Sequence, residues 1–133
     1  MLKRDDRLRD YVLPVRIVAS EKTNNAKTLL NADLTQIGLR EMDVATVHSG
    51  GYVILDFGRE LQGGVRILTS GTAGEALVRI RLGESVSECC AELGEKGACN
   101  DHSLRDLTIP MCQLSDMQFC MSGFRFARID VLG

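Results

Sequence analysis

The chain is poor in several residue types that commonly carry recognition or chemistry. It has no Trp, only two Tyr and only two His among 133 residues. Sugar-binding surfaces usually present an exposed aromatic ring that stacks on carbohydrate C–H groups, so the shortage of aromatics argues against an independent lectin. Neither His has a second His or a Cys at ligand spacing, and the sequence therefore predicts no metal site.

The chain also lacks an excess of charge and a long apolar run. Sixteen basic residues stand against eighteen acidic ones, giving a formal net charge of -2. Such a balance offers no electrostatic attraction to phosphates, so nucleic-acid binding is not expected. No run approaches the roughly 20 apolar residues of a membrane helix, and the charged start, MLKRDDRLRD, does not lead into a signal peptide. No membrane partner is predicted, and the localisation is left open.

The five cysteines form no recognisable framework. An odd number leaves at least one unpaired, and the spacings match neither a zinc site nor a small disulfide scaffold. We expect small buried hydrophobic side chains in a reducing compartment. The adjacent pair could oxidise only to a strained ring. The residues concerned are Cys89, Cys90, Cys99, Cys112 and Cys120.

The remaining composition describes one ordinary globular domain over residues 1–133, with 44% hydrophobic and 26% charged residues. Tyr52 to Glu84 reads as three strands of an antiparallel meander, separated by the glycine-rich turns Gly58 to Gly64 and Gly71 to Gly74. From Ala76 to Leu82, apolar residues at even positions alternate with Leu77, Arg79 and Arg81 at odd positions. This pattern predicts a strand with one face in the core and one face mostly in water.

Weaker patterns flank this meander. The earlier ones are an edge strand over Tyr11 to Ala19, a short helix around Ala26 to Asn31, strands at Gln36 to Leu39 and Asp43 to Val47, and a turn at His48 to Gly51. The later ones are strands at Leu104 to Met111, Gln118 to Cys120 and Phe124 to Leu132. In the last strand the apolar residues change parity, which predicts either a bulge or a central strand covered on both faces.

Ser85 and Glu88 fit a capping box that opens a short helix within Glu84 to Gly97. Its apolar stripe would consist of Val86, Cys89, Cys90 and Leu93.

Two groups of polar residues contain the side chains of hydrolytic enzymes. Asp101, His102 and Ser103 are the residue types of a catalytic triad, but adjacent residues cannot form its relay line, and a polar loop is the simpler interpretation. Paired carboxylates about 5 to 10 Å apart catalyse glycosyl transfer. Here the candidate acids are better explained as the solvated side of the predicted helix. They are Glu84, Glu88, Glu92 and Glu95. We therefore predict no catalytic residue and no cofactor.

Several short motifs occur together in a specific order. They are Leu55 to Leu61 (LDFGREL), Gly63 to Arg66 (GGVR), Gly71 to Gly74 (GTAG), Leu82 to Glu84 (LGE) and Gly123 to Ile129 (GFRFARI). In this order and spacing they resemble the concanavalin-like β-sandwich domain that precedes the catalytic barrel in bacterial α-L-rhamnosidases. The resemblance covers residues 52 to 133, and the segment from Glu84 to Asp106 looks like the version found in gut Bacteroides-type bacteria.

The resemblance implies a fold and a context. The expected fold is all-β, a two-sheet antiparallel β-sandwich of jelly-roll type with one or two short helices. The parent would be a periplasmic or secreted glycoside hydrolase whose downstream (α/α)-barrel removes terminal α-L-rhamnose by an inverting mechanism. Because the catalytic carboxylates belong to that barrel, this chain is expected to be a non-catalytic accessory domain.

Its expected partners are the barrel of the same parent chain and rhamnose-containing glycans. Contacts with either are expected from the polar loop residues Asn100, Asp101, His102 and Arg105, together with Glu84. Two alternatives stay open: a free-standing carbohydrate-binding module, and an assembly domain whose sheet face docks another subunit.

Overall fold

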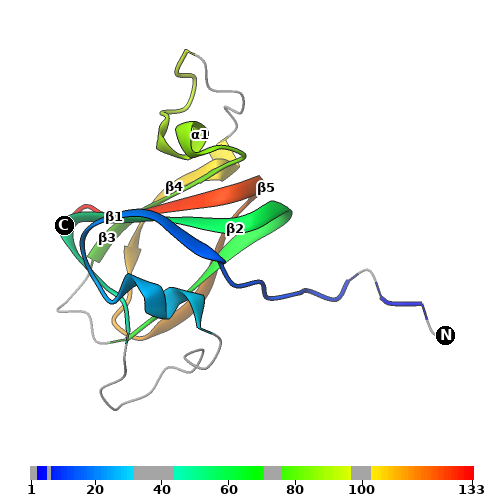
Figure 1. Ribbon diagram of the computed structural model, residues 1–133, viewed down its shortest axis with the longest axis horizontal. Helices are drawn as coiled ribbons and strands as arrows, with labels where there is room; N and C mark the ends of the chain where they lie inside the picture. The colour runs from blue at the N-terminus through cyan, green and yellow to red at the C-terminus, as the bar shows by residue number, and fades with distance from the viewer. Residues whose placement is uncertain (1–2, 6, 32–43, 71–75, 97–102) are drawn as a thin grey trace.

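The computed structural model describes residues 3–5, 7–31, 44–70, 76–96 and 103–133. The strand predicted at Gln36 to Leu39 and the turn predicted at Gly71 to Gly74 lie outside this part of the chain. In chain order the elements are β1 (Arg16–Asn24), η1 (Ala26–Leu30), β2 (Thr46–Thr69), β3 (Ala76–Gly83), α1 (Val86–Cys90), η3 (Ser103–Arg105), β4 (Asp106–Met111) and β5 (Ser115–Val131), shown in Figure 1.

The five strands form one antiparallel sheet in the order β1-β2-β5-β3-β4. The all-β prediction with short helices is thus confirmed. The described strands all belong to this one continuous sheet. The central strand is β5, which agrees with the prediction that the last strand is central because it carries apolar residues on both faces.

The predicted turn at Gly58 to Gly64 is wrong, because β2 continues through it. The pairing of β2 with β5 shifts register twice, once between Asp56 and Leu61 and once between Gly63 and Val65. Gly58 adopts φ 78°, a left-handed conformation that favours glycine. Glycines with a positive φ occur in β-bulges as well as in turns. The glycine-rich segment that was predicted to be a turn is therefore a bend within one long strand.

The order of strand pairing also differs from the predicted meander. β3 pairs with β4 and β5 and has no pairing with β2. The predicted edge strand is confirmed as β1, although it begins at Arg16 and continues to Asn24. The predicted turn from His48 to Gly51 lies inside β2. The helix predicted after β1 is confirmed as the 3-10 helix η1.

The main core lies against one face of the bent sheet. Phe57 and Phe124 meet there edge to face, with ring centroids 5.5 Å apart. The core consists of Val53, Leu55, Phe57, Val65, Val78, Ile80, Leu82, Met111, Phe119, Phe124 and Ala127. Phe126 instead joins a smaller cluster with Ile54 and Cys89. The register of β2 against β5 shifts where β2 passes Arg125, and Phe124 and Phe126 lie in different clusters although they share parity.

Helix α1 covers part of the smaller cluster. The Ser85 hydroxyl accepts a hydrogen bond from the Glu88 amide at 3.1 Å, which confirms half of the capping box. The Glu88 carboxylate accepts instead from the Glu84 amide, at 3.3 Å. The helix ends at Cys90, and Leu93 is exposed rather than part of the apolar stripe. None of the described helices is long and apolar enough to cross a bilayer.

The described cysteines only partly follow the expected burial. Cys89 is fully buried, and burial together with the neighbouring Cys90 raises its pKa to about 12. Burial likewise raises the pKa of the Cys120 thiol to about 11. Cys112 is exposed, contrary to the prediction. These four thiols are free, and Cys99 lies outside the described residues.

Candidate functional site

The structure describes two of the five residues predicted to contact sugar or barrel. Glu84 follows β3 and is exposed, and Arg105 ends η3. Asn100, Asp101 and His102 lie outside the described residues. The predicted polar loop therefore has no structural account here.

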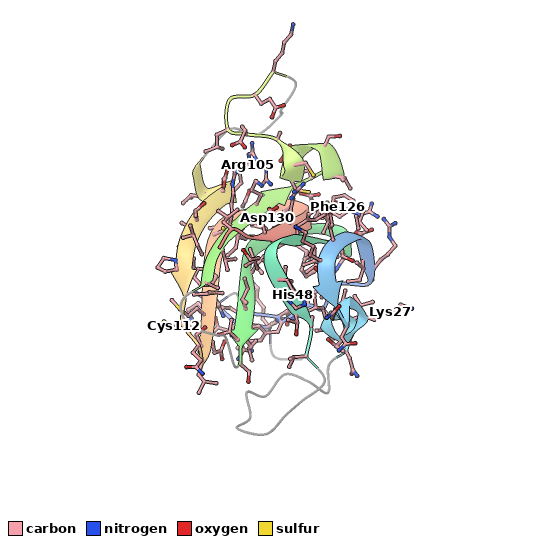
Figure 2. The ribbon with its side chains drawn as sticks, turned by 90° about the vertical axis from the view of Figure 1, so that its left-hand side faces the viewer. Lys27, His48, Arg105, Cys112, Phe126 and Asp130 are labelled. Atoms are coloured by element: carbon pink, nitrogen blue, oxygen red, sulfur yellow. The ribbon has the colours of Figure 1, made fainter. Side chains whose placement is uncertain are left out.

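Arg105 is fully buried beside the end of α1. Its exposed fraction is 0%, and Figure 2 shows it beside the helix. The guanidinium donates from Nη1 to the Glu88 carbonyl at 3.2 Å and from Nη2 to the Glu92 carbonyl at 3.3 Å. Arg105 thus supplies a charged donor to one carbonyl of α1, which also accepts from the Ala91 amide, and to one carbonyl beyond the end of the helix. A contact of Arg105 with sugar or barrel stays a prediction, and in the fold its guanidinium binds these two carbonyls.

Arg81 differs from the prediction that one face of β3 is mostly solvated. Its exposed fraction is 6%, and it donates to the Asp130 carboxylate at 3.1 Å and to the Cys90 carbonyl at 3.0 Å. Helix α1 packs on this side of β3 and excludes water from it. Arg79, on the same strand, bridges Asp106 and Glu92. Glu92 is therefore exposed but paired, rather than freely solvated.

Glu84 belongs to a group of oxygens gathered over Gly123 of β5, which we name the Gly123 cluster. It consists of Glu60, Gln62 and Glu84. A Cβ atom placed on Gly123 would lie 3.6 Å from Oε1 of Glu60, 3.6 Å from Oε1 of Glu84 and 3.5 Å from Oε1 of Gln62. The absence of a side chain at Gly123 thus leaves space in which β2 and the segment after β3 present acceptor oxygens together.

The surroundings of Glu60 in the Gly123 cluster raise its pKa. Desolvation raises the pKa of Glu60, and both repulsion from and hydrogen bonding with Glu84 raise it further. The buried Glu88 carboxylate adds to the repulsion, while Arg125 opposes it. The two Oε1 atoms are at most about 7 Å apart, since both lie 3.6 Å from one point.

That upper bound overlaps the range used by glycosidase acid pairs, roughly 5 to 10 Å, but does not place the two groups within it. Moreover, Glu60 and Glu84 are both exposed, whereas a general acid of this kind is held in an apolar pocket that raises its pKa. The Gly123 cluster is suited to accept hydrogen bonds from hydroxyl or amide donors. Among the described residues, no group of three or more His, Cys, Asp or Glu side chains is placed to hold a metal ion.

Asp56 fixes the bend beside this cluster. Its carboxylate is buried and accepts from Arg16 at 2.9 Å, from Arg125 at 2.9 Å and from the Gly58 amide at 2.7 Å. Hydrogen bonding by Arg125, Gly58 and Arg16 outweighs desolvation and holds the pKa of Asp56 far below its usual range. Sequence reasoning missed this role, although an acid within an otherwise apolar strand was the available signal.

Comparison with known proteins gives one informative likeness. No family model matches the chain, and the search of curated proteins found no match. Among solved structures, the chain is similar to a rhamnosidase from Klebsiella oxytoca with rhamnose bound, with 20% sequence identity and a TM-score of 0.59. The similarity covers 92% of this chain and 25% of that one. The chain thus shares the fold of about one quarter of a larger rhamnosidase.

Proposed function

We propose that this chain is a non-catalytic accessory β-domain of an α-L-rhamnosidase-like glycoside hydrolase. In this proposal it supports a downstream (α/α)-barrel that hydrolyses terminal α-L-rhamnose. The observation that carries the proposal is the fold likeness, which takes in nearly all of this chain but only a quarter of the rhamnosidase. The ordered motifs from Leu55 to Ile129 support the same assignment. We also infer a concanavalin-like domain from the ordered motifs, and its Bacteroides type from the segment Glu84 to Asp106.

The chemistry of the described residues agrees with an accessory role. The carboxylates of the Gly123 cluster, Glu60 and Glu84, are exposed and offer acceptor oxygens at the surface. Asp56 is committed to ion pairs within the fold. We therefore propose Glu84 as a contact to the barrel or to its glycan, with hydrolysis performed by residues of the barrel.

Complementation tests this function. The barrel encoded with this chain would be produced alone and together with the chain, and hydrolysis of an aryl α-L-rhamnoside would be compared after a heat challenge. We expect the two to co-elute in size-exclusion chromatography, and the barrel to keep its activity to a higher temperature when the chain is present. The chain alone should release no rhamnose. Rhamnose release by the chain alone, or a barrel indifferent to it, would contradict the proposal.

A further inference from the structure

The thiol of Cys90 lies against a guanidinium group at the end of α1. Nη1 of Arg128, on β5, donates a hydrogen bond to the Cys90 sulfur at 3.3 Å. The same guanidinium donates to the Asp130 carboxylate at 2.9 Å, and its Cζ atom lies 4.3 Å from the centroid of the Tyr52 ring. Hydrogen bonding with Asp130 and, to a smaller extent, with Cys90 raises the pKa of Arg128. Cys90 is half-buried, so part of the residue remains in contact with water.

Positive charge exceeds negative charge around this thiol. Arg81 and Arg128 share one carboxylate, that of Asp130, at 3.1 Å and 2.9 Å. Arg81 also donates to the Cys90 carbonyl at 3.0 Å, so both cations lie at the same end of α1. Arg81 is 6% exposed, and its Nε atom is a buried donor without a hydrogen-bond partner in the described part of the chain. An anion or an oxygen acceptor at this place would therefore complete the group.

The other described thiols lack this setting. Burial raises the pKa of Cys89 to about 12, and its sulfur donates to the Val86 carbonyl at 3.2 Å. Burial also raises the pKa of Cys120 to about 11. Cys112 is exposed, but no basic side chain of the described residues hydrogen bonds to its sulfur. The thiolate is the reactive form of cysteine, and a neighbouring guanidinium stabilises its negative charge, so Cys90 is the thiol best placed to react.

We propose that Cys90 is a modification site, at which hydrogen peroxide oxidises the thiol to sulfenic acid. The sulfur attacks one peroxide oxygen, and an S–O bond forms as the O–O bond breaks. Sulfur is oxidised and the peroxide is reduced, and the hydroxide that leaves takes the thiol proton to become water. The new oxygen is an acceptor for Arg128, in a group where Nε of Arg81 has none. The adjacent Cys89 could close only a strained ring, so the sulfenic acid persists until an external reagent attacks it.

This modification is independent of the rhamnosidase assignment, because it involves only residues of this chain.

Peroxide treatment in the presence of dimedone, which traps sulfenic acids, tests the site. The chain is treated at neutral pH and digested, and mass spectrometry follows the label at each cysteine, with fragment ions separating Cys90 from Cys89. We expect Cys90 to be labelled about tenfold faster than the more exposed Cys112, because a charge-assisted hydrogen bond stabilises its thiolate. In urea the unfolded chain should label Cys90 and Cys112 at nearly the same rate, since the contact with the guanidinium is lost.

Variants test the role of the guanidinium group. Arg128→Gln should slow the labelling of Cys90 about tenfold and leave the rate at Cys112 unchanged. Arg66→Gln is the matched control, because Arg66 pairs with the exposed Asp116, and it should keep the Cys90 rate. The proposal is overturned by equal or faster labelling of Cys112 in the folded chain, by a Cys90 preference that survives in urea, or by a folded Arg128→Gln variant with an unchanged Cys90 rate. The comparison of Cys90 with Cys112 needs no substitution, so it remains decisive if Arg128→Gln does not fold.

Discussion

Replacement of Asp56 by asparagine is the most direct test of how the sheet keeps its bend. The carboxylate joins β1, β2 and β5 through Arg16, the Gly58 amide and Arg125. The Asp56→Asn side chain would have nearly the same shape and could still accept from the Gly58 amide. The substitution would leave two guanidinium groups without their anion.

The expected cost follows from the burial of each partner. Removing one member of a fully buried ion pair costs about 3 to 5 kcal/mol. The Asp56 side chain is only 3% exposed, but Arg16 is 59% exposed and Arg125 is 42% exposed, so water can partly solvate the guanidinium groups left behind. We therefore expect the lower end, about 3 kcal/mol. With a urea m-value of about 1.5 kcal/mol/M, the midpoint would fall by about 2 M.

Urea unfolding at several pH values provides the assay. Because folding lowers the pKa of Asp56, its contribution is complete above the unfolded pKa of about 3.9 and declines as pH falls toward the folded value. The difference between Asp56→Asn and the unsubstituted protein should therefore narrow below about pH 4. Asp116→Asn is the matched control, since the Asp116 pair with Arg66 is exposed and should cost at most about 1 kcal/mol. A loss below about 1 kcal/mol for Asp56→Asn, or a gap independent of pH, would refute the reasoning.

Three further changes probe other features. Glu60→Gln should raise the urea midpoint at pH 7, because folding raises the pKa of Glu60 and its charged form therefore destabilises the folded state. This gain should vanish below about pH 4, where the Glu60 side chain is neutral in both the folded and the unfolded state. Arg105→Ala should lower the free energy of unfolding by about 3 kcal/mol, since two carbonyls lose a charged donor. It should also reduce the protection of α1 amides from hydrogen exchange, and unchanged protection would contradict this role of Arg105. Gly64→Ala should lower the free energy of unfolding by about 1 to 3 kcal/mol, because its Cβ would lie 2.5 Å from backbone oxygens of β5. Gly63→Ala is the matched control: its Cβ would meet nothing within 4 Å, so the thermal midpoint should change little.

Local patterns predicted the elements better than their connections. The strand over Ala76 to Leu82 and the cap at Ser85 depend on neighbouring residues, and both were found, although Arg81 on the face predicted to be solvated is buried. Whether Gly58 to Gly64 turns the chain or bends one strand depends on a partner some 60 residues later, in β5. No local signal specifies that pairing, so the meander and the turn were predicted wrongly.

The site was harder to predict for a related reason. An Arg in a polar segment is usually exposed, and Arg105 is buried where it meets one carbonyl of α1 and one carbonyl beyond that helix, a contact that forms only in the folded chain. The Gly123 cluster brings Glu60 and Glu84 together from segments that are adjacent only after folding. The glycine at position 123 was the sequence signal for this cluster, since a glycine within a strand often indicates that other groups approach the backbone closely.

The order of strands has a consequence for biosynthesis. Among the described strands, β1 pairs only with β2 and β4 pairs only with β3, so that β5 joins the two pairs into one sheet. β5 is also the last of these five strands to leave the ribosome. A nascent chain that has not yet passed Ser115 would hold two unconnected hairpins with exposed apolar faces, and such species rely on chaperones. Assembly of the sheet is therefore expected to be late and abrupt, set by the docking of its final strand.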